Sequence, residues 1–283
     1  MPTKIEKDSV TGTETTGHEW DGIKELNTPL PRWWLYVLYA TIIWSLVYYL
    51  LYPTIPGIAG LMGYSQREEV VERMAQARAR QAGNLDGIAA SPLEAIKADP
   101  DLLNFALTGG RAAFADNCAP CHAAGGAGRP GYPTLADDSW LWGGTLDEIE
   151  TTLRHGVRTD DDDTREGEMP AFGADELLEK EQIEAVADYV LSLSTQAAGA
   201  AGEGLELYAE NCASCHGGAG QGGREYGAPR LADQIWLYGG EKADIVAQIT
   251  KPRHGVMPAW AGRLDDTTIK MLAVYVHALG GGE

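Results

Sequence analysis

The sequence predicts a mainly α-helical chain in which one N-terminal transmembrane helix precedes two tandem copies of a small domain. Three observations lead to this prediction. A stretch of 20 residues carries no charge, several short blocks occur twice in the same order, and each series of blocks begins with the pentapeptide Cys-Xaa-Xaa-Cys-His. The expected boundaries are a tail at 1–32, the transmembrane helix at 33–52, a linker at 53–99, and domains at 100–195 and 196–283.

The uncharged stretch runs from Trp33 to Tyr52 and is rich in aliphatic and aromatic residues. As a helix it would be about 30 Å long, which matches the hydrocarbon core of a membrane. Aromatic residues stand at both ends, as is typical of membrane interfaces. The length and these flanks argue against a buried core helix. The stretch is also too long for a cleavable signal peptide, and no small-residue cleavage site follows it.

The linker contains a segment rich in charge, Gln66 to Gln81. Its apolar residues recur at helical spacing, which predicts an amphipathic helix. Such a helix would lie at the membrane surface or on a partner protein.

Each Cys-Xaa-Xaa-Cys-His pentapeptide carries the residues that attach a haem covalently. Two thiols three positions apart can add to the two vinyl groups of one haem, and the following histidine then binds the iron. A redox or zinc site is the alternative, but two copies with no spare cysteine favour two covalently bound haems c. The predicted covalent residues are Cys118, Cys121, Cys212 and Cys215, and the first axial ligands are His122 and His216.

A repeated unit of roughly 90 residues surrounds each motif, and a haem at its centre would complete its small core. Apolar spacing predicts helices at 102–117 and 204–211 before the motifs, and at 181–193 and 266–279 at the far ends. Glycine-rich loops lie between them. A helix that leads into the motif and a second helix packed across it resemble the arrangement of class I cytochrome c domains.

A methionine in each repeat is the predicted second axial ligand. Met169 and Met257 begin matching Met-Pro-Ala-aromatic blocks, 47 residues after His122 and 41 residues after His216. The sequence order predicts the pairs His122 with Met169 and His216 with Met257. A proline after the methionine stiffens the loop, and a thioether ligand raises the reduction potential. The alternative is that these methionines only fill the core.

Two further matched residues, a histidine and the arginine before it, stand in each repeat. His155 and His254 are the competing axial ligands, and bis-histidine ligation would lower the potential. His254 precedes Met257 by only three residues, so both cannot easily bind one iron. Arg154 and Arg253 are the predicted contacts of the haem propionates, because a guanidinium matches a carboxylate in geometry.

The net charge of −19 excludes nucleic acid as a target and favours a basic partner. Residues 100–195 carry a net charge of −13, whereas residues 196–283 carry −3. An insertion of 11 residues in the first repeat holds the acidic run Asp160, Asp161, Asp162 and Asp163. A solvated loop explains such a run, and a docking patch for a basic electron donor or a calcium site are the alternatives.

From Asn27 to Leu279 the chain resembles the CcoP and FixP subunits of cbb3-type cytochrome c oxidases. The resemblance rests on the block Asn-Thr-Pro-Leu-Pro-Arg-Trp-Trp at 27–34, the charged linker, and the paired blocks at 140–144 with 236–240 and 154–157 with 253–256. Some relatives carry two membrane spans, whereas this chain has one.

The resemblance implies an electron-transfer subunit in the bacterial inner membrane. It would accept electrons from a c-type cytochrome and relay them through two haems c. A monohaem cytochrome subunit and a catalytic haem-copper subunit would follow, with small single-span subunits completing a proton-pumping oxidase. By itself the chain would not be an enzyme.

Two arguments about orientation conflict. Basic residues are more frequent after the span than before it, which weakly favours a cytoplasmic C-terminal side. Covalent haem attachment on the outer membrane face, a property of cytochromes c, implies periplasmic haem domains and a cytoplasmic N-terminus. The second argument decides, because acidic residues accompany the arginines of the linker.

Two other function classes fit the same motifs. A free-standing, membrane-tethered dihaem electron shuttle needs the same haems and the same anchor. A dihaem peroxidase or dehydrogenase would need one iron with an open position, and the two matched methionines argue against it.

Overall fold

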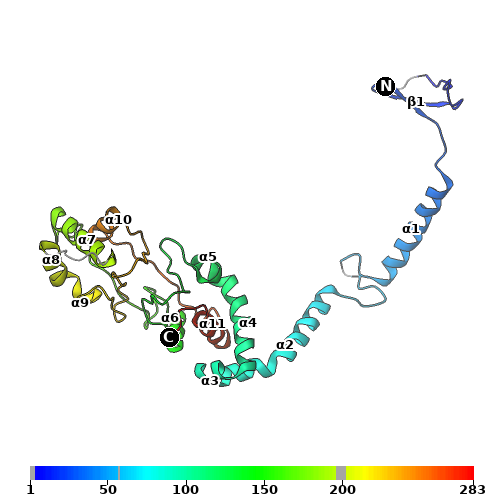
Figure 1. Cartoon of the computed structure of the whole chain (residues 1–283). Coiled ribbons are helices and arrows are strands. Elements are labelled where there is room, and N and C mark those ends of the chain that lie inside the picture. The colour runs from blue at the N-terminus through cyan, green and yellow to red at the C-terminus, as the bar shows by residue number, and fades with distance from the viewer. Residues whose placement is uncertain (1–3, 57, 196–201) are drawn as a thin grey trace. The chain divides into compact units, whose positions relative to one another are not determined.

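The computed structural model describes residues 4–56, 58–195 and 202–283, and it divides into two compact units, 1–80 and 81–283 (Figure 1). The predicted start of a domain at residue 196 lies outside the described residues. The first unit holds β1 (Thr15–Trp20), β2 (Ile23–Leu26), α1 (Arg32–Leu51) and most of α2 (Gln66–Ala90). The second unit holds α3 (Leu93–Ala98), α4 (Pro100–Asn117), α5 (Ala119–His122), the 3-10 helix η1 (Ala124–Gly126), α6 (Leu146–His155), α7 (Lys180–Thr195), α8 (Glu203–Asn211), α9 (Ala213–His216), α10 (Lys242–Thr250) and α11 (Asp266–His277).

The N-terminal tail forms an antiparallel hairpin of β1 and β2, which the sequence analysis did not predict. Its turn consists of Asp21 and Gly22, both with positive φ, and Asp-Gly is a preferred sequence for a turn of this kind. The local signal was therefore present in the sequence.

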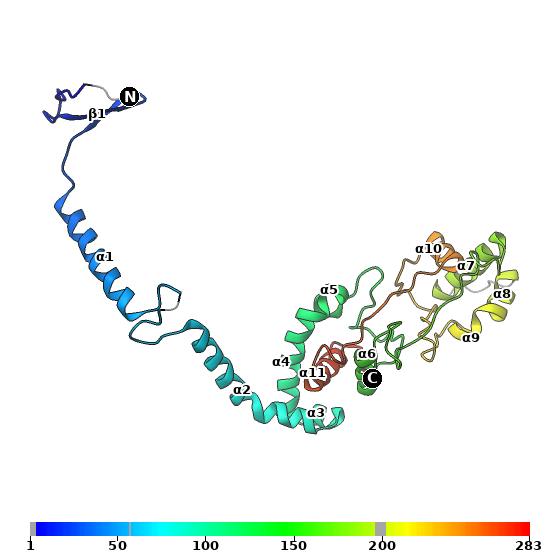
Figure 2. The same cartoon turned by 180° about the vertical axis from the view of Figure 1, so that it is seen from behind.

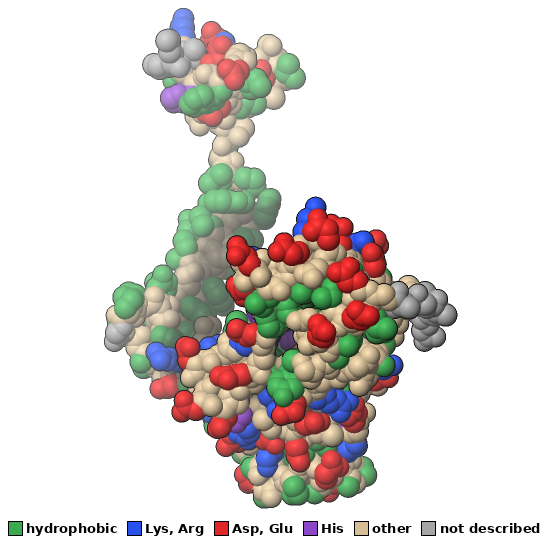
Figure 3. Space-filling model, turned by 90° about the vertical axis from the view of Figure 1, so that its left-hand side faces the viewer, with side chains coloured by type: hydrophobic (Ala, Val, Ile, Leu, Met, Phe, Trp, Pro, Cys, Tyr) green, Lys and Arg blue, Asp and Glu red, His purple; other side chains and the backbone are tan. Residues whose placement is uncertain are grey.

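Helix α1 is the one candidate membrane span in the described part of the chain, and it begins and ends one residue before the predicted span. None of its residues is buried in the structure. Hydrophobic side chains cover the face of α1 that Figure 3 presents. A helix whose apolar surface stays exposed in this way is suited to a lipid environment.

Helix α2 extends to Ala90, nine residues beyond the predicted helix, and its last residues belong to the second unit. Ile88 is fully buried there. The ammonium group of Lys270, on α11, donates hydrogen bonds to the carbonyl oxygens of Ile88, Ala89 and Ser91 at 3.3, 3.0 and 2.8 Å. The last part of the predicted linker, 53–99, thus packs in the folded core together with α3.

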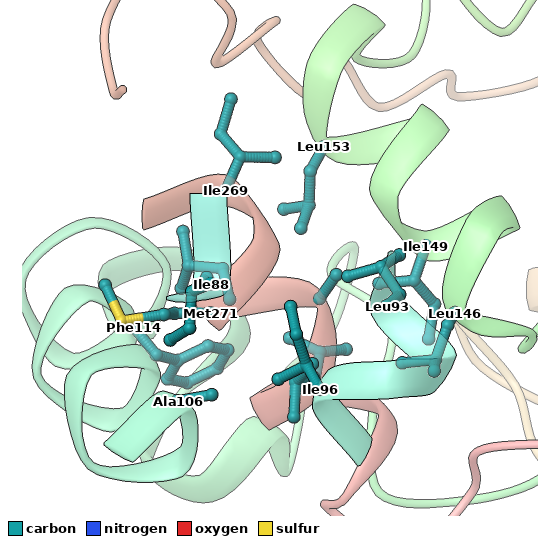
Figure 4. Close-up of a cluster of buried hydrophobic side chains, with 14 of the residues drawn as sticks. Ile88, Leu93, Ile96, Ala106, Phe114, Leu146, Ile149, Leu153, Ile269 and Met271 are labelled. Carbon is teal, nitrogen blue, oxygen red and sulfur yellow. The ribbon is translucent and has the colours of Figure 1, made fainter. Parts of the chain in front are cut away.

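The first hydrophobic core joins helices of both repeats. Side chains of α3, α4 and α6 surround Ile269 and Met271 of α11, which Figure 4 shows among the residues Phe114, Ile96 and Leu153. Helix α11 is the last helix of the second repeat, yet it packs on α4 and α6 of the first. Figures 1 and 2 both show α11, in red, beside α4 and α6.

The second core has the reciprocal composition. Helix α7, the last helix of the first repeat, packs on α8 and α10 of the second repeat. The buried residues of this core include Val186 and Val190 of α7, Tyr208 of α8 and Ile245 of α10. Both views of the chain place these three helices together with α9 (Figures 1 and 2).

The predicted domains, 100–195 and 196–283, follow the two sequence repeats, whereas each hydrophobic core draws on both repeats. The sequence repeats are as expected, and the chain has two cytochrome c-type folded units after one candidate membrane helix. Each hydrophobic core, however, contains the C-terminal helix of the other repeat. The structure also adds α6 and α10, which the sequence analysis did not predict, and α6 begins with a capping box of Thr145 and Glu148.

Candidate functional site

Both Cys-Xaa-Xaa-Cys-His motifs have the same local structure. Helices α4 and α8 end directly before Cys118 and Cys212, and one short turn of helix carries the chain to His122 and His216. The Nδ1 atom of His122 lies 3.0 Å from the carbonyl oxygen of Pro133. His216 makes the matching contact with Pro229, also at 3.0 Å.

These hydrogen bonds fix the tautomer of both imidazoles. A carbonyl oxygen only accepts, so Nδ1 carries the proton and donates it to the proline carbonyl. Nε2 then keeps its lone pair, which is the atom that a metal-binding histidine offers. Each motif therefore presents an oriented imidazole whose Nε2 could bind a haem iron.

A glycine closes the loop after each motif histidine. The amide of Gly128 donates to the carbonyl of His122 at 2.8 Å, and Gly222 donates to His216 at 2.7 Å. Both glycines have positive φ, and a Cβ at Gly128 would lie 2.6 Å from the amide nitrogen of Thr134. Glycine is therefore required at this point of the loop, because a side chain there would displace the loop that contacts the histidine.

Burial sets the protonation of the motif residues. It lowers the pKa of His122 and of His216, against the opposing effect of their backbone hydrogen bonds. Both rings are thus held in the neutral form that binds metal. Burial, together with the neighbouring motif cysteine, raises the pKa of the Cys118 and Cys212 thiols to about 11.

The second motif opens into a cavity of about 260 Å³. Cys212, Cys215 and His216 line one part of it, and the remaining walls are mainly apolar. Met169, from the first repeat, lines the same cavity. Two thiols, an oriented imidazole and a thioether around one apolar pocket fit a haem c.

Each of the two predicted methionines packs against the core that contains the haem motif of the other repeat. Met169 packs against the second core, and Met257 packs against the first. The sequence predicts the pairs His122 with Met169 and His216 with Met257, and the structure places Met169 at the cavity of His216. The reason is that the chain passes from one hydrophobic core to the other before each methionine.

Arg154, one of the two predicted propionate contacts, forms ion pairs within the protein. Its guanidinium binds Glu150 at 2.7 Å and Asp266 at 2.6 Å, so a propionate would have to compete with these two carboxylates. Arg253 lines the second cavity, where its Nη2 donates to the carbonyl of Tyr238 at 3.0 Å. Arg253 thus remains a candidate.

The two histidines that compete as axial ligands, His155 and His254, lie in different surroundings. His155 shares a hydrogen bond of 2.9 Å with Asp161, next to its own helix α6. His254 lines the second cavity but is exposed.

Three further arginines were missed by the sequence analysis. Arg158 and Arg230 line the second cavity. The Nε of Arg165 is buried without a hydrogen-bond partner among the described residues, and its guanidinium carbon lies 5.9 Å from the ring centre of Trp142. A buried, unpaired N–H fits the carboxylate that a haem propionate would supply. Arg158 and Arg165 stand in the insertion of the first repeat, so comparison of the repeats could not identify them.

The acidic run of the insertion is mostly solvated. Asp160, Asp162 and Asp163 are exposed, whereas Asp161 accepts hydrogen bonds from His155 and from the amide of Asp163. The hydrogen bond from His155 is the main cause that lowers the pKa of Asp161. Ligand atoms of His155, Asp161 and Asp163 lie within 4.8 Å of one another, but calcium prefers oxygen ligands alone. The geometry therefore gives no support to a calcium site.

Comparisons with known families match three parts of this chain. Family models match residues 12–59 as the N-terminal domain of cytochrome oxidase-cbb3, FixP, residues 107–194 as cytochrome c, and residues 199–276 as cytochrome c oxidase, cbb3-type, subunit III.

Curated relatives agree with these models. A cbb3-type cytochrome c oxidase subunit CcoP from Azospirillum brasilense is 56% identical over 98% of this chain and 99% of its own. A subunit FixP from Bradyrhizobium diazoefficiens is 50% identical over 100% of both chains. The chain belongs to the CcoP/FixP family of cbb3-type cytochrome c oxidase subunits.

Proposed function

We propose that this chain relays electrons through two covalently bound haems c towards the oxygen-reducing subunit of a cbb3-type oxidase. The observation that carries the proposal is the matched pair of histidines, each half-buried and each fixed through Nδ1 by a proline carbonyl. A haem c bound at each motif would take up and release one electron. The apolar pocket at the second motif supports the same role.

The residues of each motif have separate tasks. Cys118 and Cys121 would hold one haem and Cys212 and Cys215 the other, while His122 and His216 supply one axial ligand each. The apolar walls exclude water and so keep the reorganisation on electron transfer small. Arg253 and Arg165 are the candidates to neutralise propionates. Catalysis itself would belong to another subunit.

The proposed partners follow from family membership. They are the catalytic haem-copper subunit, the monohaem cytochrome subunit, small single-span subunits and a c-type cytochrome donor. We place the chain in the bacterial inner membrane, with α1 across it and the N-terminal hairpin in the cytoplasm. The second compact unit, residues 81–283, which we call the haem unit, would lie in the periplasm. Exposed apolar side chains along the whole of α1 support an anchor in lipid.

Purification of the chain in mild detergent tests this function. Under the proposal, an affinity tag on the chain recovers b-type haem and copper in the optical and metal analysis, together with larger subunits on the gel. Recovery of the chain alone, with both haems c intact, would instead support a free-standing electron shuttle.

Cysteine variants supply the control. Cys212→Ser with Cys215→Ser should leave one haem-staining unit on the chain, as should Cys118→Ser with Cys121→Ser. A dihaem peroxidase would differ in a third way, because its reduced form would bind small ligands at one iron and turn over peroxide.

A further inference from the structure

We propose that residues 58–62, the closing segment, fold over the C-terminal end of α1 in the membrane interface and that their apolar side chains contact phospholipid. The inference goes beyond the relay of electrons, and it rests on the proposed placement of α1 across the membrane. It gives the chain a second element in contact with lipid, which would fix the depth at which the span ends.

Backbone hydrogen bonds join the closing segment to the end of α1. The amide of Leu61 donates to the carbonyl oxygen of Leu50 at 2.9 Å, and the amide of Met62 donates to that of Leu51 at 3.1 Å. Both views of the chain show a loop at this end of α1 (Figures 1 and 2). The last carbonyls of a helix have no partner within the helix, and polar backbone groups in a membrane need one. The closing segment supplies a partner to two of them.

Gly60 permits the close approach of the segment to the helix. Its φ is +68°, and a Cβ there would lie 2.5 Å from the carbonyl oxygen of Leu51. Gly63 has a similar φ of +59°, but a Cβ there would meet nothing within 4 Å. Both positions have a left-handed backbone, whereas only Gly60 also lacks the room for a side chain. The contact with the end of α1 therefore depends on Gly60.

The side chains of the closing segment are apolar and exposed. Leu61 is 82% exposed, Met62 60% and Ile58 54%. Residues 33–66 carry no charge, so the uncharged part of the sequence continues well beyond the span. A cluster of exposed apolar side chains marks an interaction site. Because this cluster continues the exposed apolar surface of α1, the lipid around the span is the partner that fits it.

Tyrosines mark the level of the closing segment in the membrane. The rings of Tyr48 and Tyr52 stack with 4.8 Å between their centres, and Tyr64 meets Tyr52 edge to face at 5.8 Å. The hydroxyl of Tyr64 donates to the carboxylate of Glu69 on α2 at 2.6 Å. Tyrosine favours the headgroup level because its ring is apolar and its hydroxyl is polar. The cluster therefore places residues 58–62 where hydrocarbon meets headgroups, next to the start of the charged helix α2.

A photoreactive label tests the proposal in the full-length chain, together with the subunits that co-purify with it. Leu61→Cys and Met62→Cys each add one thiol, and the motif cysteines are blocked by haem under the proposed function. A benzophenone maleimide is attached to the new thiol, and the protein is placed in vesicles of phosphatidylethanolamine and phosphatidylglycerol. On illumination the ketone takes a hydrogen atom from a neighbouring C–H group, and the two carbon radicals join. Mass spectrometry of the chain identifies the neighbour.

Two positions calibrate the label. Ile43, in α1, is 63% exposed, so Ile43→Cys should give a phospholipid adduct. Val10, in the N-terminal tail, is apolar and 91% exposed, so Val10→Cys controls for exposure alone and should give none. Absence of the adduct from Ile43→Cys would refute the membrane span, and this inference with it. Covalent haem in the same protein would still leave the electron relay standing.

The proposal expects phospholipid adducts at Leu61→Cys and Met62→Cys with a yield similar to that at Ile43→Cys. An adduct with another subunit would assign the segment to a protein interface. Absence of any adduct would place the segment in water. Either of these two results would overturn the proposal.

A matched pair of glycine variants tests the closure over α1. Gly60→Ala, added to Leu61→Cys, should lower the yield of the phospholipid adduct several-fold, because the new methyl group pushes the segment away from Leu51. Gly63→Ala is the control, since it brings similar backbone strain without that contact, and it should leave the yield higher than Gly60→Ala does. Equal yields in the two variants would show that the contact with the helix end does not position the segment, and would overturn the closure.

Discussion

Gly110 on α4 lies against Tyr275 on α11, and a Cβ at Gly110 would come 2.6 Å from the Cβ of Tyr275. The ring of Tyr275 also packs on Phe114, with 5.4 Å between ring centres. The other unit repeats this relationship, since a Cβ at Gly204 on α8 would lie 3.3 Å from the Cβ of Tyr189 on α7. Each close helix crossing therefore joins one repeat to the other.

The first prediction concerns this crossing. Gly110→Ala should lower the free energy of unfolding of the haem unit by about 1–3 kcal/mol, because the new methyl group also meets the backbone carbonyl of Met271. Gly83→Ala, on α2, is the matched control, since a Cβ there meets nothing within 4 Å. That control should be neutral or stabilising by up to about 1 kcal/mol. Thermal unfolding followed by circular dichroism measures both, and equal midpoints would contradict the crossing.

Much of this arrangement could be predicted from the sequence, and the partner of each helix could not. The motifs, the apolar span and the helices at 102–117 and 266–279 have strong local signals, and the structure contains them. The repeats, however, carry nearly the same local signals. Tyr189 and Tyr275 stand in equivalent places, so the apolar pattern fits either partner equally well. Connections and interface contacts decide between the two, and they are not local.

The other omissions have different physical causes. The hairpin and α6 had local signals in Asp21 with Gly22 and in Thr145 with Glu148, which the analysis of repeats did not use. Arg165 had none, because its importance comes from burial beside Trp142 and not from a pattern. Arg154 matches Arg253 in the sequence of the repeats, but its guanidinium forms ion pairs with two carboxylates of the protein.

The second prediction concerns the attachment of α2 to the haem unit. Lys270→Met should destabilise this unit by about 1.5–3 kcal/mol, because the carbonyl oxygens of Ile88, Ala89 and Ser91 lose a charged donor. Lys180→Met is the control, since Lys180 is exposed and forms only a long ion pair of 3.7 Å with Glu184. Its effect should stay within about 0.5 kcal/mol. Hydrogen exchange at the end of α2 should rise in the first variant and not in the control.

The third prediction concerns reduction potentials. Met257→His should keep both covalent haems and lower the potential of the haem at Cys118 and Cys121 by about 0.1 V or more, because imidazole replaces a thioether. Met169→His should lower the other potential by a similar amount. Met271→Leu is the control, since Met271 is a buried core residue of α11. Redox titration of the visible spectrum measures all three, and an unchanged potential in either histidine variant would contradict that methionine's role.

The fourth prediction concerns the electron donor and the exposed acidic side chains of the insertion. Acidic side chains are prominent on the face of the haem unit in Figure 3, and a basic cytochrome would be steered by such a field. Changing Asp160, Asp162 and Asp163 to Asn removes exposed charge while it keeps Asp161, whose carboxylate holds the loop through His155.

The triple variant should slow donor association at low salt and flatten its salt dependence, with both haem spectra unchanged. Exposed charges are screened beyond about 8 Å at physiological ionic strength, so the difference between the proteins should shrink as salt rises. The matched control changes Asp175, Glu176 and Glu179 to their amides, which removes the same charge from another part of the first repeat. Stopped-flow reduction by the donor measures the rate. An equal loss in both variants would show that net charge alone steers the donor, and no loss in the first would place the docking site on another surface or subunit.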